Sequence, residues 1–326
     1  MENKKKGFTL VELLVVISII SLLMAILLPS LNKARQAAYS VVCISHLRQC
    51  GVAMSIYATD HDDYLAGPDT SGIELNSNTA PSDSSPTVPV QNMDWVSPTL
   101  GKELALPRNR FYRIAKILNT ALRCPANREK NAYIYDADPA WPPDLPAESL
   151  RYSSYSAALG FHLCGENVVG KNIITAYELE SDNEVSIPPN YLPLLQMIGK
   201  PSDKIYVLDG ARYIDPSLGL SFNDFPKQIE GGNFMLYGPA TPLTGDPYVG
   251  ALKGIGAQRH LDPTPNNYKY GWRHNKGLNA VFFDGHCANL KAQDSLSISY
   301  YFPKGTTVLN PALTQDLNAT KGMVIQ

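Results

Sequence analysis

Residues 4–28 read KKKGFTLVELLVVISIISLLMAILL, three lysines and a glycine followed by 21 residues that are almost wholly apolar. A helix of that length is about 31 Å long, which matches the roughly 30 Å hydrocarbon core of a bilayer. We therefore predict a single membrane-spanning helix. The lysines at its N-terminal flank predict that this end stays in the cytoplasm and that the chain beyond residue 28 lies on the far side.

Two simpler interpretations of this segment are less satisfactory. A secretory signal peptide has an apolar core of about 7–15 residues and ends in a small-x-small cleavage site. Here the apolar run is longer and continues through Pro29 in a helical pattern. A plain membrane anchor gives no reason for Glu12, because an unpaired carboxylate deep in a bilayer costs about 2.5–3.5 kcal/mol. Glu12 therefore needs a partner.

Residues 6–13 (KGFTLVEL) resemble the processing site of type IV pilins and of the pseudopilins of type II secretion systems. The resemblance implies that a prepilin peptidase cuts after Gly7 and methylates the new N-terminus at Phe8. It also implies that Glu12 acts in assembly, where it faces the N-terminal amine of a neighbouring subunit in a filament. Two opposite charges would then be paired inside an apolar bundle.

Pro29 is expected to bend or locally melt the long helix of this family, because proline lacks a backbone donor and its ring clashes with the preceding turn. The alternative is a simple helix end at the membrane surface. Beyond it, apolar residues recur at spacings of 4, 3, 4 and 3, which is one face of a helix packed on a globular head. These residues are Cys43, Leu47, Cys50, Met54 and Tyr57.

The predicted organisation therefore has four parts. Residues 1–7 are a leader, residues 8–29 a transmembrane and assembly helix, residues 30–60 its amphipathic continuation, and residues 61–326 an exported head. The fold class is α+β and pilin-like, with the long helix against an antiparallel sheet and with long irregular insertions. The polar stretch over residues 69–98 predicts an exposed loop, and residues 100–122 predict a further helix.

Composition argues against nucleic acid as a partner, and one acidic segment could bind a divalent ion. The 28 Lys and Arg against 30 Asp and Glu provide no broad basic face for nucleic acid. Asp60, Asp62 and Asp63 follow the long helix and would suit Ca²⁺ or another divalent ion. The glycine and the late glutamate of a calcium-binding EF-hand loop are missing, which favours a solvated acidic turn. We expect no cofactor otherwise.

Five cysteines in an exported head permit disulfides and leave at least one thiol. Cys43 and Cys50 are about 10 Å apart along one helix, too far to pair. Cys124 is the most plausible partner for Cys43, whereas Cys50 would reach Cys164 or Cys287 or stay a buried thiol. The absence of C-x-x-C and H-x-x-x-H spacings disfavours zinc.

The second half of the chain contains two β-rich runs. Residues 204–210 read KIYVLDG, and residues 278–290 read LNAVFFDGHCANL. The second run predicts a hairpin around Asp284 and Gly285, because Asp-Gly suits a two-residue type I′ turn in which both positions have positive φ.

His274, nine intervening residues, Asp284 and Gly285 resemble the H-X9-DG signature, here over residues 274–285, of a large family of prepilin-processed proteins. In that family the motif closes the exported domain. Residues 43–49, 123–125, 153–156 and 204–210 resemble further landmarks of the same family. The resemblance covers most of the chain, although Cys50 replaces a usually aliphatic residue and the proline-rich loops are individual.

The chemical role of the motif has two interpretations. His274, Asp284 and His286 form an N/O set that Zn²⁺ or Mn²⁺ accepts. The favoured interpretation is structural: His274 bonds to a backbone carbonyl or to Asp284 and locks the hairpin to the preceding strand.

Enzyme signatures such as G-x-S-x-G, H-E-x-x-H or a P-loop do not occur, which favours a structural subunit over a catalyst. The resemblance implies a filament subunit of a type IV pilus or type II secretion-like system, anchored by one span in the inner membrane with a periplasmic or extracellular head. Its partners would be prepilin peptidase, other pilin-like subunits, the inner-membrane assembly machinery and the bilayer. The alternative is a membrane-anchored glycan- or ligand-binding protein that stacks sugars on Trp95, Trp141, Tyr191 and Trp272.

Overall fold

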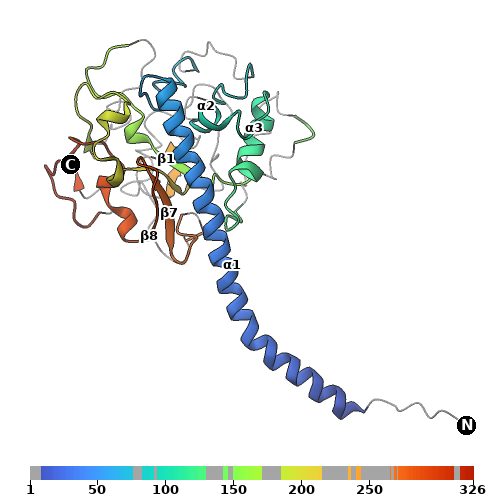
Figure 1. The fold of residues 1–326 in the computed structure, drawn as a ribbon. Coiled ribbons are helices and arrows are strands. Elements are labelled where there is room, and N and C mark those ends of the chain that lie inside the picture. Colours follow the sequence, from blue (N-terminus) through green and yellow to red (C-terminus); the bar gives the residue numbers. More distant parts are fainter. Residues whose placement is uncertain are drawn as a thin grey trace, which may run out of the picture.

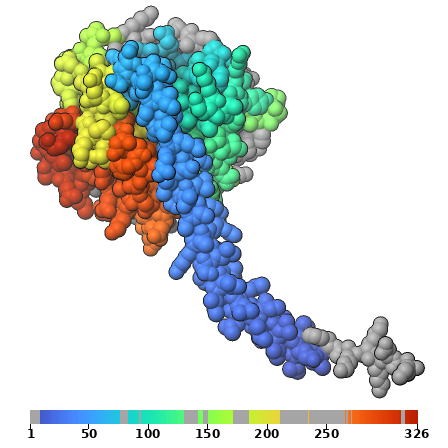
Figure 2. Space-filling model, in the orientation of Figure 1, coloured from blue at the N-terminus to red at the C-terminus, as the bar shows by residue number. Residues whose placement is uncertain are grey.

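The computed structural model describes residues 9–75, 83–91, 94–129, 142–145, 150–170, 185–214, 234–235, 240–243, 265, 268–269, 271–311 and 316–326. One helix, α1 (Leu10–Asp60), has 51 residues and extends from a mixed helix and strand head as a long stalk (Figure 1). Figure 2 shows its C-terminal half lying along the surface of the head and its N-terminal half projecting away from it.

The two halves of α1 have different surroundings. From Leu10 to Leu28 the large apolar side chains are between 44% and 80% exposed. In the C-terminal half one face is buried against the head, which confirms the predicted helical stripe. The buried residues are Cys43, Leu47, Cys50, Gly51, Ala53, Met54, Tyr57 and Ala58.

The helix is continuous across Pro29, so the alternative in which it ends there is wrong. Figure 1 shows that the projecting part of α1 bends, and Pro29 belongs to that part. A proline inside a helix removes one backbone hydrogen bond and is a common cause of such bending. A kink at Pro29 itself stays a prediction.

The core of the head is a five-stranded sheet in the order β5-β1-β3-β7-β8. Its strands are β1 (Tyr155–Ala158), β3 (Ile205–Asp209), β5 (Phe234–Met235), β7 (Gly277–Phe282) and β8 (Cys287–Lys291). Three of the four pairings are antiparallel, and β1 pairs with β5 in parallel. The helix α1 packs on β3, β7 and β8. The predicted α+β class is confirmed, although this sheet contains one parallel pair.

Smaller elements surround this core. Two short pairings join β2 (Val185–Ser186) to β9 (Thr307–Val308) and β4 (Ala211–Ile214) to β6 (Ala240–Leu243). The helix expected over residues 100–122 is divided: α2 (Val96–Leu100) precedes it, and α3 (Arg110–Lys116) runs into a π-helical turn, Ile117–Ala121. Asn109 begins α3 because its side chain accepts bonds from two backbone amides of the first turn.

The expectation of an exposed loop over residues 69–98 is wrong for the described parts of that stretch. Leu75, Val90 and Trp95 are at most 1% exposed. The buried Asp94 carboxylate accepts bonds from three backbone amides, those of Val90, Val96 and Ser97. A few large apolar residues and one carboxylate therefore anchor a segment whose composition is mostly polar.

The hairpin of β7 and β8 is confirmed, but its turn is not type I′. Gly285 has φ +86°, whereas Asp284 keeps negative φ. The Gly285 amide donates to the Phe282 carbonyl, and the Phe282 amide donates to the His286 carbonyl. This is a three-residue loop in which a type I turn is followed by glycine in the left-handed region. Only the glycine therefore needs positive φ.

The acidic turn after α1 is exposed, as expected for a solvated turn. Asp62 and Asp63 have positive φ, and the Asp63 amide donates to the Ala58 carbonyl at the helix end. Binding of Ca²⁺ or another divalent ion by Asp60, Asp62 and Asp63 stays a prediction.

His162 is a fully buried histidine within this core. Its Nδ1 lies 2.9 Å from the Ala66 carbonyl oxygen, and its ring packs against Phe234 at a centroid distance of 4.9 Å. Burial lowers the pKa of His162 to about 3, against a smaller opposing effect of the Ala66 carbonyl. The ring is therefore neutral in the folded chain at every ordinary pH.

Folding stability should consequently fall in acid. An unfolded histidine has a pKa near 6.5, so the contribution of His162 is complete above about pH 6.5 and is lost as the pH falls toward 3. Between pH 7 and pH 5 we expect this residue to lower the free energy of unfolding by about 2 kcal/mol. Urea unfolding of the full chain, followed by the fluorescence of the buried Trp95 and Trp272, measures it.

The matched variant is His162→Gln, which can still donate to the Ala66 carbonyl but does not titrate. Its stability should lack this part of the pH dependence. An equal loss between pH 7 and pH 5 in the variant and the natural chain would contradict the assignment.

Candidate functional site

The N-terminal site lies only partly within the described residues. Gly7 and Phe8 are outside them, so cleavage and methylation there stay predictions. Glu12 is described, in the first turn of α1, where Thr9 is the N-cap. The Glu12 carboxylate accepts from the Thr9 amide and hydroxyl, each at 2.8 Å, and the Glu12 amide donates to the Thr9 hydroxyl at 3.2 Å. This is a capping box.

The capping box gives Glu12 a partner within the single chain, which the sequence prediction missed. The T-x-x-E spacing at the start of an apolar helix is the signal that would have found it. The pairing with a neighbouring amine stays a prediction, since a second chain is needed to form it.

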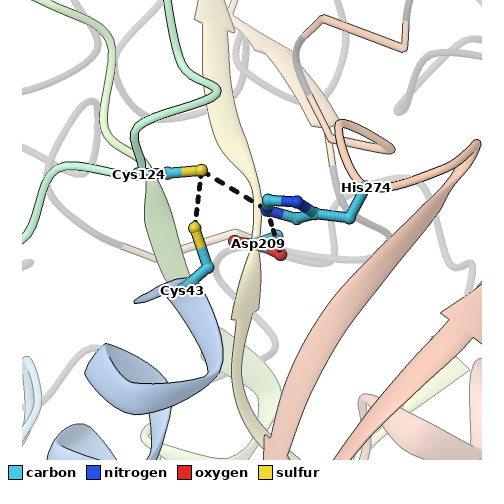
Figure 3. A group of neighbouring side chains, drawn as sticks. All are labelled: Cys43, Cys124, Asp209 and His274. Atoms are coloured by element: carbon cyan, nitrogen blue, oxygen red, sulfur yellow. Dashed lines mark hydrogen bonds and ion pairs between the residues drawn. The ribbon is translucent and has the colours of Figure 1, made fainter. Parts of the chain in front are cut away.

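A second group of polar side chains lies deep in the head. Cys43 comes from α1, Cys124 from the segment after the π-helical turn, Asp209 from the end of β3, and His274 from the segment before β7 (Figure 3). All four residues are at most 3% exposed. We call them the Cys-Asp-His cluster.

The atoms of the Cys-Asp-His cluster face one another. The two sulfurs are 2.7 Å apart, and Cys124 Sγ lies 3.4 Å from His274 Nε2. The same nitrogen is 3.3 Å from Asp209 Oδ2. One donor atom from each of the four residues lies within 4.8 Å of every other. Figure 3 shows the four side chains pointing toward one another from a helix, a strand and two loops.

Arg273 brings a positive charge to the cluster. Its Nη2 atom is 3.9 Å from Asp209 Oδ1 and donates to the Ser154 carbonyl at 2.6 Å. The Asn279 amide donates to Asp209 Oδ2 at 2.9 Å. The buried carboxylate is thus held between a guanidinium, an imidazole and a backbone amide, which is the kind of compensation that a buried charge requires.

Burial and charge move the pKa values of the cluster in opposite directions. Burial raises the pKa of Asp209 to about 7, and the nearby sulfur adds to this, against the effects of His274, Arg273 and the Asn279 amide. Burial also raises the pKa of Cys124, but the Cys43 hydrogen bond and the charges of Arg273 and His274 outweigh it and lower the pKa of this thiol. When both cysteines are reduced, Cys124 is the sulfur that ionises first.

The pKa of His274 is raised above its ordinary value. Burial lowers it, but the hydrogen bond with Cys124 and the negative charges of Asp209 and Cys124 more than compensate. A thiolate and an imidazolium next to each other are mutually stabilising. The cluster therefore suits either a disulfide between Cys43 and Cys124 or the binding of a cation by the thiolates.

The role expected for the H-X9-DG residues needs correction. The His274 side chain faces Asp209 and Cys124 and not Asp284, and its backbone is paired with that of Gly277. Asp284 instead accepts from His286, from the backbone amide at 3.1 Å and from Nδ1 at 2.6 Å. These two residues lie at the exposed hairpin turn, so the set of His274, Asp284 and His286 is not one metal-ligand group in the described structure.

The other candidate residues have clear positions. Trp95, Tyr191 and Trp272 are each at most 1% exposed, so they do not form a stacking surface for glycans. Trp141 lies outside the described residues. Three of the four residues named for a glycan-binding head are therefore buried, and the part of that prediction that concerns Trp141 is untested.

The projecting half of α1 is the remaining candidate for a functional surface. Within the described part of the chain, α1 is a helix long and apolar enough by composition to cross a membrane, and none of its most apolar window is buried by the head. Comparison with known proteins bears on this half.

Residues 3–28 match the family model of the prokaryotic N-terminal methylation motif. The chain is similar to the type IV wide pilus major component PilA4 of Thermus thermophilus, with 41% identity over 61 residues, which are 19% of this chain and 47% of that protein. It is also similar to the competence protein ComGC of Halalkalibacterium halodurans, with 38% identity over 60 residues, 18% of this chain and 59% of that protein.

A third relative is the ComG operon protein 3 homolog of Bacillus licheniformis, with 36% identity over 58 residues, 18% of this chain and 60% of that protein. The chain thus spans 47% to 60% of the length of these relatives. No solved structure matches it. The prepilin-type motif at the N-terminus is confirmed, whereas the H-X9-DG resemblance of the head stays a prediction.

Cys43 and Cys124 are free cysteines in the structure, with their sulfurs 2.7 Å apart, so a disulfide between them after export stays a prediction. The bond would close a loop across 81 positions of the chain, and such a loop stabilises by about 4 kcal/mol in the chain-entropy model. We expect non-reducing peptide mapping of the exported chain to show a Cys43–Cys124 cross-link. Cys124→Ala should lower the free energy of unfolding of the oxidised chain by about 4 kcal/mol.

The control is Cys164→Ser, a buried cysteine outside the cluster, which should leave the cross-link intact. If a maleimide labels both Cys43 and Cys124 in the exported chain once it is unfolded without reductant, the disulfide is not present.

Proposed function

We propose that the protein is a pilin-like structural subunit that a prepilin peptidase processes and that assembles into a type IV pilus or a type II secretion-like filament. The observation that carries the proposal is the prepilin-type motif at the start of a 51-residue helix whose first half is apolar all round and lies outside the head. The named relatives are a type IV pilus component, a competence protein and a ComG operon protein homolog, which supports the proposal.

The exposed apolar half of α1 needs a nonaqueous environment. Its large apolar side chains would destabilise the chain in water, since each such side chain gains about 1.5–3 kcal/mol on full burial. Before assembly the bilayer provides that environment, with the lysines in the cytoplasm and the head on the far side of the inner membrane. In a filament the same side chains pack against the helices of other subunits. Extraction from lipid requires energy from assembly machinery, because the two environments are similarly apolar.

Glu12 has a different partner in each state. In the single chain the capping box with Thr9 satisfies its carboxylate. In the filament the carboxylate would face the positive N-terminal amine of a neighbouring Phe8. An incoming subunit that is out of register would leave both charges unpaired in an apolar surrounding, so the pair selects the correct axial position.

Processing is the first prediction of this proposal. We expect mass spectrometry of the chain from its native host to give a mature N-terminus at Phe8 with one added methyl group. Gly7→Leu should retain residues 1–7, because a bulky side chain at the cut site blocks the peptidase. A natural chain recovered with its three lysines and with no methyl group would contradict the proposal.

The second prediction of the proposal concerns filament assembly. Glu12→Gln should leave processing and membrane insertion intact but lower the amount of sheared surface filament by at least about tenfold. The variant leaves the N-terminal amine of the neighbouring Phe8 without its carboxylate partner, and an unpaired charge deep in an apolar surrounding costs about 2.5–3.5 kcal/mol. Immunoblots of the sheared fraction, normalised to the membrane fraction, measure this loss.

Ser21→Ala is the matched control for this experiment. Among the described residues the Ser21 hydroxyl bonds only to the Ile17 carbonyl of the same helix, so assembly of this variant should continue. Filament formation at the natural level in Glu12→Gln would rule out the register role of the carboxylate.

A further inference from the structure

The Cys-Asp-His cluster contains more chemistry than a disulfide uses. A bond between Cys43 and Cys124 accounts for two of its four side chains. It leaves Asp209 and His274 pointing at the same sulfurs from two other segments of the chain. Within the described structure Asp209 Oδ1 is buried and accepts no hydrogen bond.

The donor atoms match one class of ligand. Two thiolates, one imidazole and one carboxylate are the ligand types that Zn²⁺ takes in four-coordinate sites. Harder cations such as Ca²⁺ and Mg²⁺ prefer oxygen alone and more ligands, so they do not fit this set. We propose that the reduced chain binds one zinc-type divalent ion through Cys43, Cys124, Asp209 and His274.

The distances suit a tetrahedral ion. Bonds of about 2.0–2.3 Å place tetrahedral ligand atoms roughly 3.3–3.8 Å apart. The separations of His274 Nε2 from Cys124 Sγ and from Asp209 Oδ2 are 3.4 and 3.3 Å. The two sulfurs are 2.7 Å apart and must separate by about 1 Å to share the ion. The two separations that involve His274 Nε2 are already at the required spacing, and all four donor atoms lie within 4.8 Å of one another.

The charges also balance. Two thiolates and the Asp209 carboxylate carry three negative charges, and the ion with Arg273 supplies three positive ones. A neutral sum matters here because uncompensated charge in a buried site costs several kcal/mol. Arg273 Nη2 lies 3.9 Å from Asp209 Oδ1, which places the guanidinium beside the carboxylate and not among the donors.

The site would be structural and not catalytic. Four protein ligands leave a zinc ion no open position for water or substrate. The ligands come from α1, the segment after the π-helical turn, β3 and the segment before β7. One ion therefore ties the stalk helix to the sheet and to two loops of the head. This role is independent of the proposed filament function.

The ion and the disulfide are alternative states of the same sulfurs. In thiol–disulfide exchange with an exported disulfide oxidant, one thiolate attacks the oxidant and the second then attacks the mixed disulfide. A Cys43–Cys124 bond forms, the disulfide bond of the oxidant breaks, its two sulfurs leave as thiolates that carry the two electrons and take up protons from water, and the metal ion is released. Oxidation after export would thus replace one cross-link of α1 by another.

The full chain in detergent, reduced with a phosphine and freed of metal, tests the proposal. Titration with Co²⁺ should saturate at one ion per chain and give the visible bands of tetrahedral cobalt with thiolate charge transfer. One equivalent of Zn²⁺ should bleach them. Cys124→Ser, Asp209→Asn and His274→Gln should each weaken Co²⁺ binding by at least about tenfold, since even second-shell losses cost 10–100-fold.

Two controls keep the result interpretable. Cys164→Ser removes a buried thiol outside the cluster and should bind Co²⁺ as the natural chain does. Asp209→Asn retains the shape of the side chain, and its far-UV circular dichroism shows whether the head is folded. A folded reduced chain that binds no Co²⁺, or cluster variants that bind it with unchanged affinity, would overturn the proposal.

Discussion

The structure depends on the contact between one face of α1 and strands β3 and β7. Gly51 allows this close approach, because a Cβ atom there would lie 2.9 Å from a methyl group of Val281. The contact buries the C-terminal half of the helix and holds the N-terminal half away from the head. It also brings Cys43 to the depth at which Cys124, Asp209 and His274 meet.

The two halves of this helix solve different physical problems. The C-terminal half buries one apolar face against the head and is stabilised by the sheet. The N-terminal half has large apolar side chains on all sides, and its described polar side chains bond within the helix itself, so its stability depends on lipid or on other helices. One continuous helix therefore connects the folded head to a segment that needs an apolar environment, which the head does not provide.

The Cys-Asp-His cluster and the neighbouring Arg273 place polar and charged side chains inside an otherwise apolar core. A buried carboxylate, a guanidinium and an imidazole are expensive to desolvate, and replacing such groups with apolar residues is often neutral for stability. Their presence at the junction of α1 with the sheet points to a need for a specific covalent or coordinative link there. Under the proposed function, such a link would keep the head packed against α1 when the helix leaves the membrane.

Local patterns in the sequence were enough for the parts of this protein whose physics is local. The apolar run, the lysines before it, the stripe from Cys43 to Tyr57 and the Asp-Gly hairpin each depend on residues close together in the chain, and the structure shows the long helix, its buried face and the hairpin. The prepilin-type motif is likewise contiguous. The T-x-x-E capping box was equally readable and was missed.

Tertiary structure alone decided the rest. Asp209, Cys124 and His274 are far apart in sequence, and no spacing rule relates them, because they meet only when β3 and β7 pair and α1 packs on them. The burial of Trp95 and Val90 within a polar stretch was also unpredictable, since composition averages over the few residues that enter the core. Local propensity determines which segments form helices and turns, whereas long-range packing determines which side chains face one another.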